Sequence, residues 1–152
     1  MLTGVEVAPG ALDAMAEASA GYPFMIQVVG YRAWREAKRR NPENGNVIQL
    51  DDVTRALPAS RRRFEARVIE PARAGLSERS LAHLETMAGL AAGDGAARSS
   101  EVAESRGGTA RSLFPAWARL LGLDLVESPG RDMLRFILPY MRECLLDRVA
   151  AE

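Results

Sequence analysis

Arginine and hydroxyl side chains are grouped between Arg106 and Gly122, in the second half of the sequence. This stretch contains three arginines and no acidic residue, and it includes an expected helix over residues 109–122. Proteins use guanidinium and hydroxyl groups near the start of such a helix to contact the phosphates and base edges of nucleic acids. The candidate contacts in this stretch are Arg106, Thr109, Arg111, Ser112 and Arg119.

A further candidate, Arg131, lies in the turn sequence SPGR between two expected strands, LDLVES and MLRFIL. A guanidinium at the tip of such a hairpin is placed to meet a phosphate or a minor groove, and Arg135 lies beyond it on the second strand. An equally weighted alternative is that these arginines are solvated residues without a ligand. The residues alone leave both interpretations open.

His83 and Cys144 are the only residues of their types. A single cysteine excludes an internal disulfide, and one cysteine with one histidine is too little for a zinc site, so we expect no metal. His83 is expected to face away from the apolar side of its helix, which predicts a surface histidine rather than a catalytic one. The Cys144 thiol is expected to be partly buried and inert.

Motifs for nucleotide hydrolysis are absent from the sequence. There is no GxxxxGK[ST] loop to hold the phosphates of ATP, and no apolar strand that ends in paired acids for magnesium. We therefore expect no catalytic residue, no cofactor bound by this chain and no enzymatic activity of its own.

The composition predicts a folded protein. The 152 residues are 47% hydrophobic and 26% charged, which is sufficient for one ordinary core or two small ones. Basic and acidic residues each total 20, so a nucleic-acid role depends on local basic surfaces, such as residues 32–73 with 11 basic and 6 acidic side chains. With no long apolar run and no signal-peptide pattern at the start, we expect a cytoplasmic protein without a membrane partner.

The first half of the chain reads as helical. Periodicity predicts helices over residues 11–19 and 23–40, the second opened by Pro23, which suits a first helical position. A third helix is expected with Asp51 as its N-cap. The helical pattern breaks at Pro71, and we place the boundary of a first domain, residues 1–73, shortly after it.

Residues 74–152 are expected to form a second domain of three helices followed by a β-hairpin. This is the order of elements in a winged helix-turn-helix domain. The whole chain is therefore expected to be mainly α, with a helical bundle first and a winged helix-turn-helix domain with a small hairpin second. The expected segments are helices over 77–92, 99–107, 109–122 and 138–151, a loop over 93–98, and strands over 123–128 and 133–138.

Two segments resemble parts of a known family. ASAGYPFMIQVVGYRAW, residues 18–34, resembles the lid region of AAA+ and STAND-type ATPases of bacteria and archaea, in which a Gly-x-Pro turn begins a lid helix beside the nucleotide. The segment from Arg98 to Leu145 resembles the winged helix that follows the lid in such proteins, and archaeal origin-recognition ATPases have a comparable order. The resemblance extends from about Leu12 to Leu146.

The resemblance implies that Gly21, Tyr22 and Pro23 face the adenine and ribose side of a nucleotide. A rigid proline turn would then let the lid respond to ATP or ADP in a full-length ATPase, of which this chain is expected to be the non-catalytic C-terminal part. The alternative is local: Gly21 ends one helix and Pro23 begins the next.

The expected function is binding of double-stranded DNA by the winged helix, with the lid sensing nucleotide. An alternative is that the winged helix contacts the ATPase core domain or a partner protein and regulates it without DNA. Pro115 is expected to kink its helix, and Leu113, Phe114 and Trp117 are expected to be used in packing, which argues against base-specific recognition.

Overall fold

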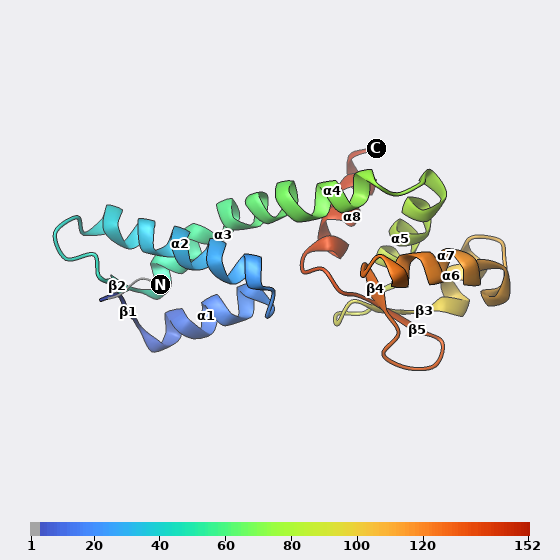
Figure 1. Ribbon diagram of the computed structural model, residues 1–152, viewed down its shortest axis with the longest axis horizontal. Helices are drawn as coiled ribbons and strands as arrows, with labels where there is room; N and C mark the ends of the chain where they lie inside the picture. The colour runs from blue at the N-terminus through green and yellow to red at the C-terminus, as the bar shows by residue number, and fades with distance from the viewer. Residues whose placement is uncertain (1–3) are drawn as a thin grey trace. The chain divides into compact units, whose positions relative to one another are not determined.

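The computed structural model describes residues 4–152, which divide into two compact units between Val68 and Ile69 (Figure 1). We call them the N-terminal and C-terminal units and describe each by itself. The domain boundary expected from the sequence, after residue 73, lies a few residues beyond this division.

The N-terminal unit is a bundle of three helices with one pair of short parallel strands. Helix α2 has the predicted bounds, because Pro23 opens it and its apolar residues recur every three to four positions. Met25, Val29, Ala33 and Ala37 are fully buried along that side. The elements are β1 (Glu6–Val7), α1 (Pro9–Ser19), α2 (Pro23–Arg40), β2 (Val47–Ile48) and α3 (Leu50–Phe64).

The start of α3 differs from the prediction. Gln49, not Asp51, is the N-cap residue. The buried Asp52 carboxylate accepts the backbone N–H of Gln49 at 2.9 Å and pairs with the guanidinium of Arg40 at 3.0 Å. Burial opposes ionisation of Asp52, but the hydrogen bonds from Arg40 and Gln49 outweigh it and hold the pKa of this carboxyl below its usual range. The ion pair with Arg40 on α2 therefore determines that Asp52, and not Asp51, is the acid that accepts a backbone hydrogen bond at the start of α3.

Pro71 does not end the helical backbone, which corrects the expected break there. A π-helical segment, η1 (Glu65–Ile69), follows α3 and leads into α4 (Glu70–Ala74). Pro71 lies in the first turn of α4, directly after the π-helical segment, so the helical backbone continues past it.

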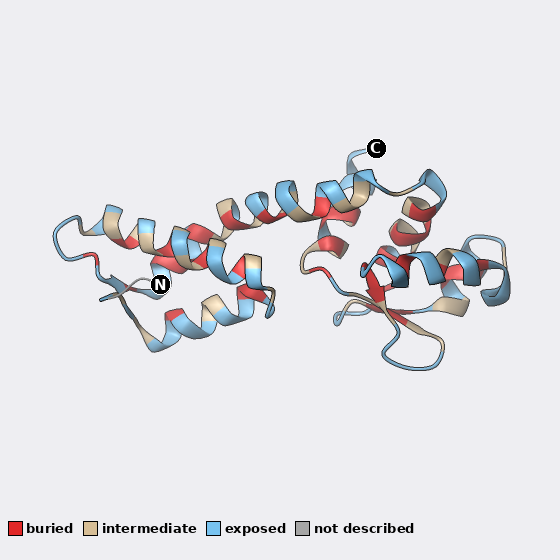
Figure 2. Cartoon of the chain, viewed as in Figure 1, coloured by how far each residue is buried: buried red, intermediate tan, exposed pale blue. Residues whose placement is uncertain are grey.

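Phe64 is the largest fully buried side chain of the N-terminal unit. Its ring meets Tyr22 edge to face, with centroids 5.2 Å apart, and lies 6.2 Å from the ring of Phe24. The end of α3 therefore supports the turn that opens α2. Figure 2 shows in red the buried residues that α2 and α3 direct into this core.

The C-terminal unit is helical with one small antiparallel sheet, so the chain as a whole is mainly α, as predicted. The sheet has the order β3-β5-β4. Its first strand, β3, lies in the segment 93–98, which was expected to be a loop. That expectation arose because Ala-Ala-Arg contains none of the β-branched or large apolar residues that indicate a strand. Helices and strands are α5 (Glu78–Leu90), β3 (Ala96–Arg98), α6 (Ser99–Ser105), α7 (Ala110–Gly122), β4 (Val126–Glu127), β5 (Met133–Phe136) and α8 (Met141–Ala151).

Side chains form hydrogen bonds with the backbone at both ends of helix α5. Ser77, the first residue of the helix predicted over 77–92, caps its start by accepting the N–H of Ser80 at 3.2 Å. At its end, the Arg142 guanidinium of α8 donates to the carbonyl oxygens of Ala88 and Ala91 at 3.2 and 3.0 Å. The long-range contact satisfies carbonyls that the helix itself leaves unpaired.

Candidate nucleic-acid interface

Helix α7 directs its apolar residues inward and its arginines outward. Leu113, Trp117 and Leu120 are buried, and their spacing of three to four residues places them on one side of the helix. Arg111 and Arg119 are exposed on the remaining surface. The packing of α7 therefore leaves an arginine-bearing surface open to solvent.

Thr109 and Ser112, both predicted as contacts to nucleic acid, form the N-terminal cap of α7. The Thr109 hydroxyl accepts the N–H of Ser112 at 3.2 Å, and the Ser112 hydroxyl accepts the N–H of Thr109 at 3.0 Å. Both residues are exposed. Their hydroxyl groups thus hold the helix start in shape, while contact with a ligand stays a prediction.

Arg106 ends α6 and is exposed beside the turn into α7. The chain reverses here through Gly107, at φ +73°, a conformation that side-chain-bearing residues rarely adopt. Next to it, a Cβ on Gly108 would lie 2.8 Å from the Ser112 hydroxyl oxygen. Two glycines therefore permit the tight turn between α6 and α7.

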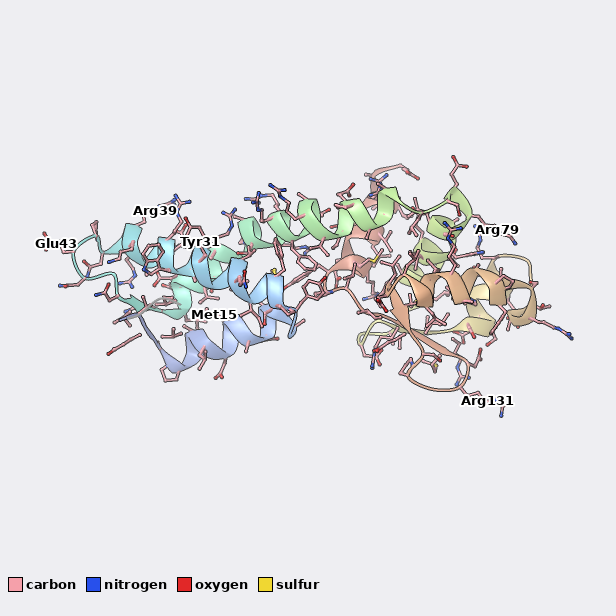
Figure 3. All side chains as sticks on the ribbon, in the orientation of Figure 1. Met15, Tyr31, Arg39, Glu43, Arg79 and Arg131 are labelled. Atoms are coloured by element: carbon pink, nitrogen blue, oxygen red, sulfur yellow. The ribbon has the colours of Figure 1, made fainter. Side chains whose placement is uncertain are left out.

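Arg131 lies in the loop between β4 and β5, and Figure 3 shows its side chain extending away from the tip of that loop. Arg135, by contrast, lies opposite Glu127 in the β4–β5 register, and its Nε donates to the Glu127 carboxylate at 2.8 Å. The hairpin therefore exposes Arg131 to solvent, whereas Arg135 pairs with Glu127 across the two strands.

The hairpin loop is tied to α6 by Asp132, a residue that the sequence analysis did not single out. Its carboxylate accepts hydrogen bonds from the hydroxyls of Ser99 and Ser100 and from the Ser100 N–H at 2.9 Å. The hydrogen bonds from Ser100 and Ser99 lower the pKa of Asp132. The only sequence signal was a Ser-Ser pair at a helix start, which without a partner reads as ordinary capping.

Replacing Asp132 with alanine is expected to loosen the hairpin loop, because three donors at the start of α6 lose their acceptor. Amide hydrogen exchange should become faster in residues 128–132 and at the start of α6, and the thermal midpoint of the C-terminal unit should fall. Glu101→Ala, which removes an exposed acid from the same helix, is the control. Equal exchange rates in the Asp132 variant and the wild type would contradict the assignment.

His83 is buried, which corrects the expectation of a surface histidine. It is 2% exposed, and its ring centroid lies 5.8 Å from that of Trp117 on α7. Within residues 4–152, neither nitrogen of this ring nor the Trp117 indole N–H has a hydrogen-bond partner. Burial lowers the pKa of His83, and the charges of Arg106 and Arg79 lower it further.

Phe114 also differs from the expectation that it would be packed. It is 68% exposed, whereas Leu113 and Trp117 are buried as predicted. The inward side of α7 is set by Leu113, Trp117 and Leu120, and Phe114 lies outside that group. An aromatic ring thus accompanies the arginines on the exposed surface of α7.

The predicted nucleotide-facing residues lie in the N-terminal unit, at the turn from α1 to α2. Gly21 has φ +73° and is exposed, as is Pro23, the first residue of α2. Tyr22 is half-buried because its ring packs on Phe64. The local interpretation of this turn, a helix end followed by a helix start, is therefore what the backbone shows, and a role toward nucleotide stays a prediction.

The described residues show neither a metal site nor a membrane span. No three His, Cys, Asp or Glu side chains among residues 4–152 are grouped as a metal ion requires. Over the same residues, no helix has both the length and the apolar composition that a bilayer span needs.

Comparison with known proteins gives a match to a family model. No curated protein and no solved structure matches the chain. The model of a domain of unknown function, DUF8462, matches residues 66–145, from the π-helical segment to the first turns of α8. Since the match covers more than half of the sequence and includes α6, α7 and the hairpin, the chain belongs to the DUF8462 family.

Proposed function

We propose that the C-terminal unit binds double-stranded DNA, with α7 in the major groove and the β4–β5 loop on the flanking backbone. The observation that carries the proposal is the exposed surface of α7, where Arg111 and Arg119 occur in a stretch without any acidic residue. Arg131 adds a guanidinium at the hairpin tip.

Unpaired positive charge supports this role. Within residues 4–152, the candidate arginines form no salt bridge, unlike Arg135, which is held by Glu127. The four candidates are Arg106, Arg111, Arg119 and Arg131. Each guanidinium that neutralises a phosphate releases counterions, which gives a salt-dependent affinity that does not need base contacts.

The same proposal places this chain in a cytoplasmic AAA+ or STAND-type ATPase, with the N-terminal unit as its lid. Gly21, Tyr22 and Pro23 would then meet ATP or ADP held by the core domain, since this chain has no phosphate loop. The gene sequence upstream of Met1 tests this part, because an in-frame phosphate-loop domain is expected there.

Salt titration of binding to a short duplex tests the DNA role. We expect the double variant Arg111→Ala/Arg131→Ala to bind about tenfold or more weakly at low salt, and its salt slope to be smaller by about 2, because two phosphate contacts are lost. Fluorescence anisotropy of a labelled duplex measures both quantities.

A control of equal charge is Arg67→Ala/Arg148→Ala, which removes two exposed arginines outside α7 and the hairpin. It should retain nearly wild-type affinity and slope. The proposal fails if the chain does not bind the duplex at low salt, or if both double variants lose affinity equally.

Phe114 favours a second candidate, in which α7 docks onto an ATPase core domain or another partner protein. An aromatic residue that is 68% exposed on a helix is a common anchor of protein interfaces. Phe114→Ala should then abolish the protein contact and leave the salt slope of duplex binding unchanged, which separates the two functions.

A further inference from the structure

Two adjoining hollows lie where α2 and α3 pack together in the N-terminal unit, and they share Arg32. We call them together the α2–α3 groove. The larger hollow, of about 270 Å³, is lined by Phe24, Gln27, Val28, Tyr31, Arg32 and Arg63. The smaller, of about 100 Å³, is lined by Arg32, Arg35, Glu36, Arg39 and Arg55 with two alanines of α3.

The smaller hollow is strongly positive. Four guanidinium groups line it against one carboxylate, that of Glu36, which lies 3.4 Å from Arg39. The nearby buried Asp52 is held by Arg40, outside the hollow, and its electrostatic interaction with Arg55 offsets only a part of this excess. A concave surface of several guanidiniums matches the geometry and charge of phosphate groups.

The larger hollow offers aromatic surface beside this charge. Tyr31 is 53% exposed, and the guanidinium carbon of Arg35 lies 5.9 Å from the centre of its ring. Figure 3 shows Tyr31 and Arg39 on the same helix, α2. Exposed aromatic rings next to arginines are platforms on which unpaired bases stack.

The groove is elongated. From Phe24 to Arg39 the axis of α2 rises about 22 Å, and guanidiniums recur along it and along α3 from Arg55 to Arg63. A single free phosphate would occupy only a part of this length. An extended ligand with regularly repeated negative charge would use all of it.

We infer that the α2–α3 groove binds single-stranded nucleic acid. One base stacks against Tyr31 and Phe24, and the phosphates that follow it lie on the arginines of the smaller hollow. The inference does not rest on duplex binding by α7, since every lining residue belongs to the N-terminal unit.

Fluorescence anisotropy with a labelled oligothymidylate of about ten nucleotides tests the inference. Tyr31→Ala should weaken binding about tenfold with little change in salt slope, because it removes stacking but no charge. Arg55→Ala should lower the salt slope by about 0.7, as expected for one phosphate contact on a single strand. Arg67→Ala, an exposed arginine of η1 that lines neither hollow, should leave both quantities at the wild-type level.

Competition and a cross-variant identify the ligand. Unlabelled oligoribouridylate should displace the probe, because phosphates and bases are common to both polymers, whereas adenosine monophosphate or inorganic phosphate at a similar nucleotide concentration should not. Displacement by either small molecule would assign the groove to free nucleotides or phosphate and overturn the inference. Wild-type affinity of both Tyr31→Ala and Arg55→Ala would also overturn it. Arg111→Ala/Arg131→Ala should bind the single strand normally, so failure here is separate from failure of the duplex proposal.

Discussion

Replacing Phe64 with alanine is expected to lower the free energy of unfolding of the N-terminal unit by about 3–5 kcal/mol. Phe64 is fully buried, and its ring contacts Tyr22 and Phe24. Its removal leaves a cavity and takes away the support of the α1–α2 turn. The loss is a large fraction of the 5–15 kcal/mol by which an ordinary domain is stable.

The two tryptophans allow this prediction to be measured in the full chain. Trp34 reports on α2, and Trp117 reports on α7. Urea unfolding of Phe64→Ala should shift the Trp34 transition strongly, and Phe64→Leu, which retains most of the volume, should cost less than about 1.5 kcal/mol. Equal losses for the two variants would show that the site relaxes around a smaller side chain and would contradict the prediction.

The second large effect is that of acid on the C-terminal unit through His83. Unfolded His83 takes up its proton near pH 6.5, whereas burial, with help from Arg106 and Arg79, lowers the pKa of the folded residue. Between the two values the unfolded state binds more protons, so stability falls as the pH drops below about 6.5. One titrating group changes the free energy of unfolding by at most about 1.4 kcal/mol per pH unit.

The measurement is the free energy of unfolding followed by Trp117 fluorescence in a Trp34→Phe background at several pH values. His83 is the only histidine, so few other groups titrate in this range. His83→Leu should abolish the pH dependence of stability between pH 5 and 7. Carboxylates with lowered pKa values, Asp52 and Asp132, act only at lower pH. A wild-type curve that is flat above pH 5 would refute this role.

Local signals predicted most of the helices. Pro23 at a first helical position and the apolar spacing of α2 placed that helix at its observed bounds, and Ser77 marked the start of α5. These features act over a few residues and are readable in one dimension. The arginines of α7 were also found in this way, because the stretch from Arg106 to Gly122 contains arginines and no acidic residue, which is visible in the sequence alone.

Features that depend on distant partners were missed or misassigned. Asp52 serves the start of α3 because Arg40 on α2 holds its carboxylate, so the prediction of Asp51 was wrong. Strand β3 exists through its pairing with β5, at the register of Ala97 with Leu134, and not through its own composition. The α2–α3 groove could not be predicted, because its arginines come from two helices and the sequence does not show how these helices pack together.

The amino-acid sequence by itself determined the helical segments, the hairpin, the lack of a phosphate loop and the clustering of arginines. Only the tertiary structure decided that His83 is buried, that Phe114 is exposed, that Asp132 anchors the hairpin loop, and that Arg135 pairs with Glu127 while Arg131 extends away from the loop. The physical reason is the distance along the sequence over which each kind of interaction acts. Helix periodicity and capping act between neighbours along the chain, whereas burial and ion pairing depend on which surfaces meet, and residues such as Ser100 and Asp132 are brought together only when the unit folds.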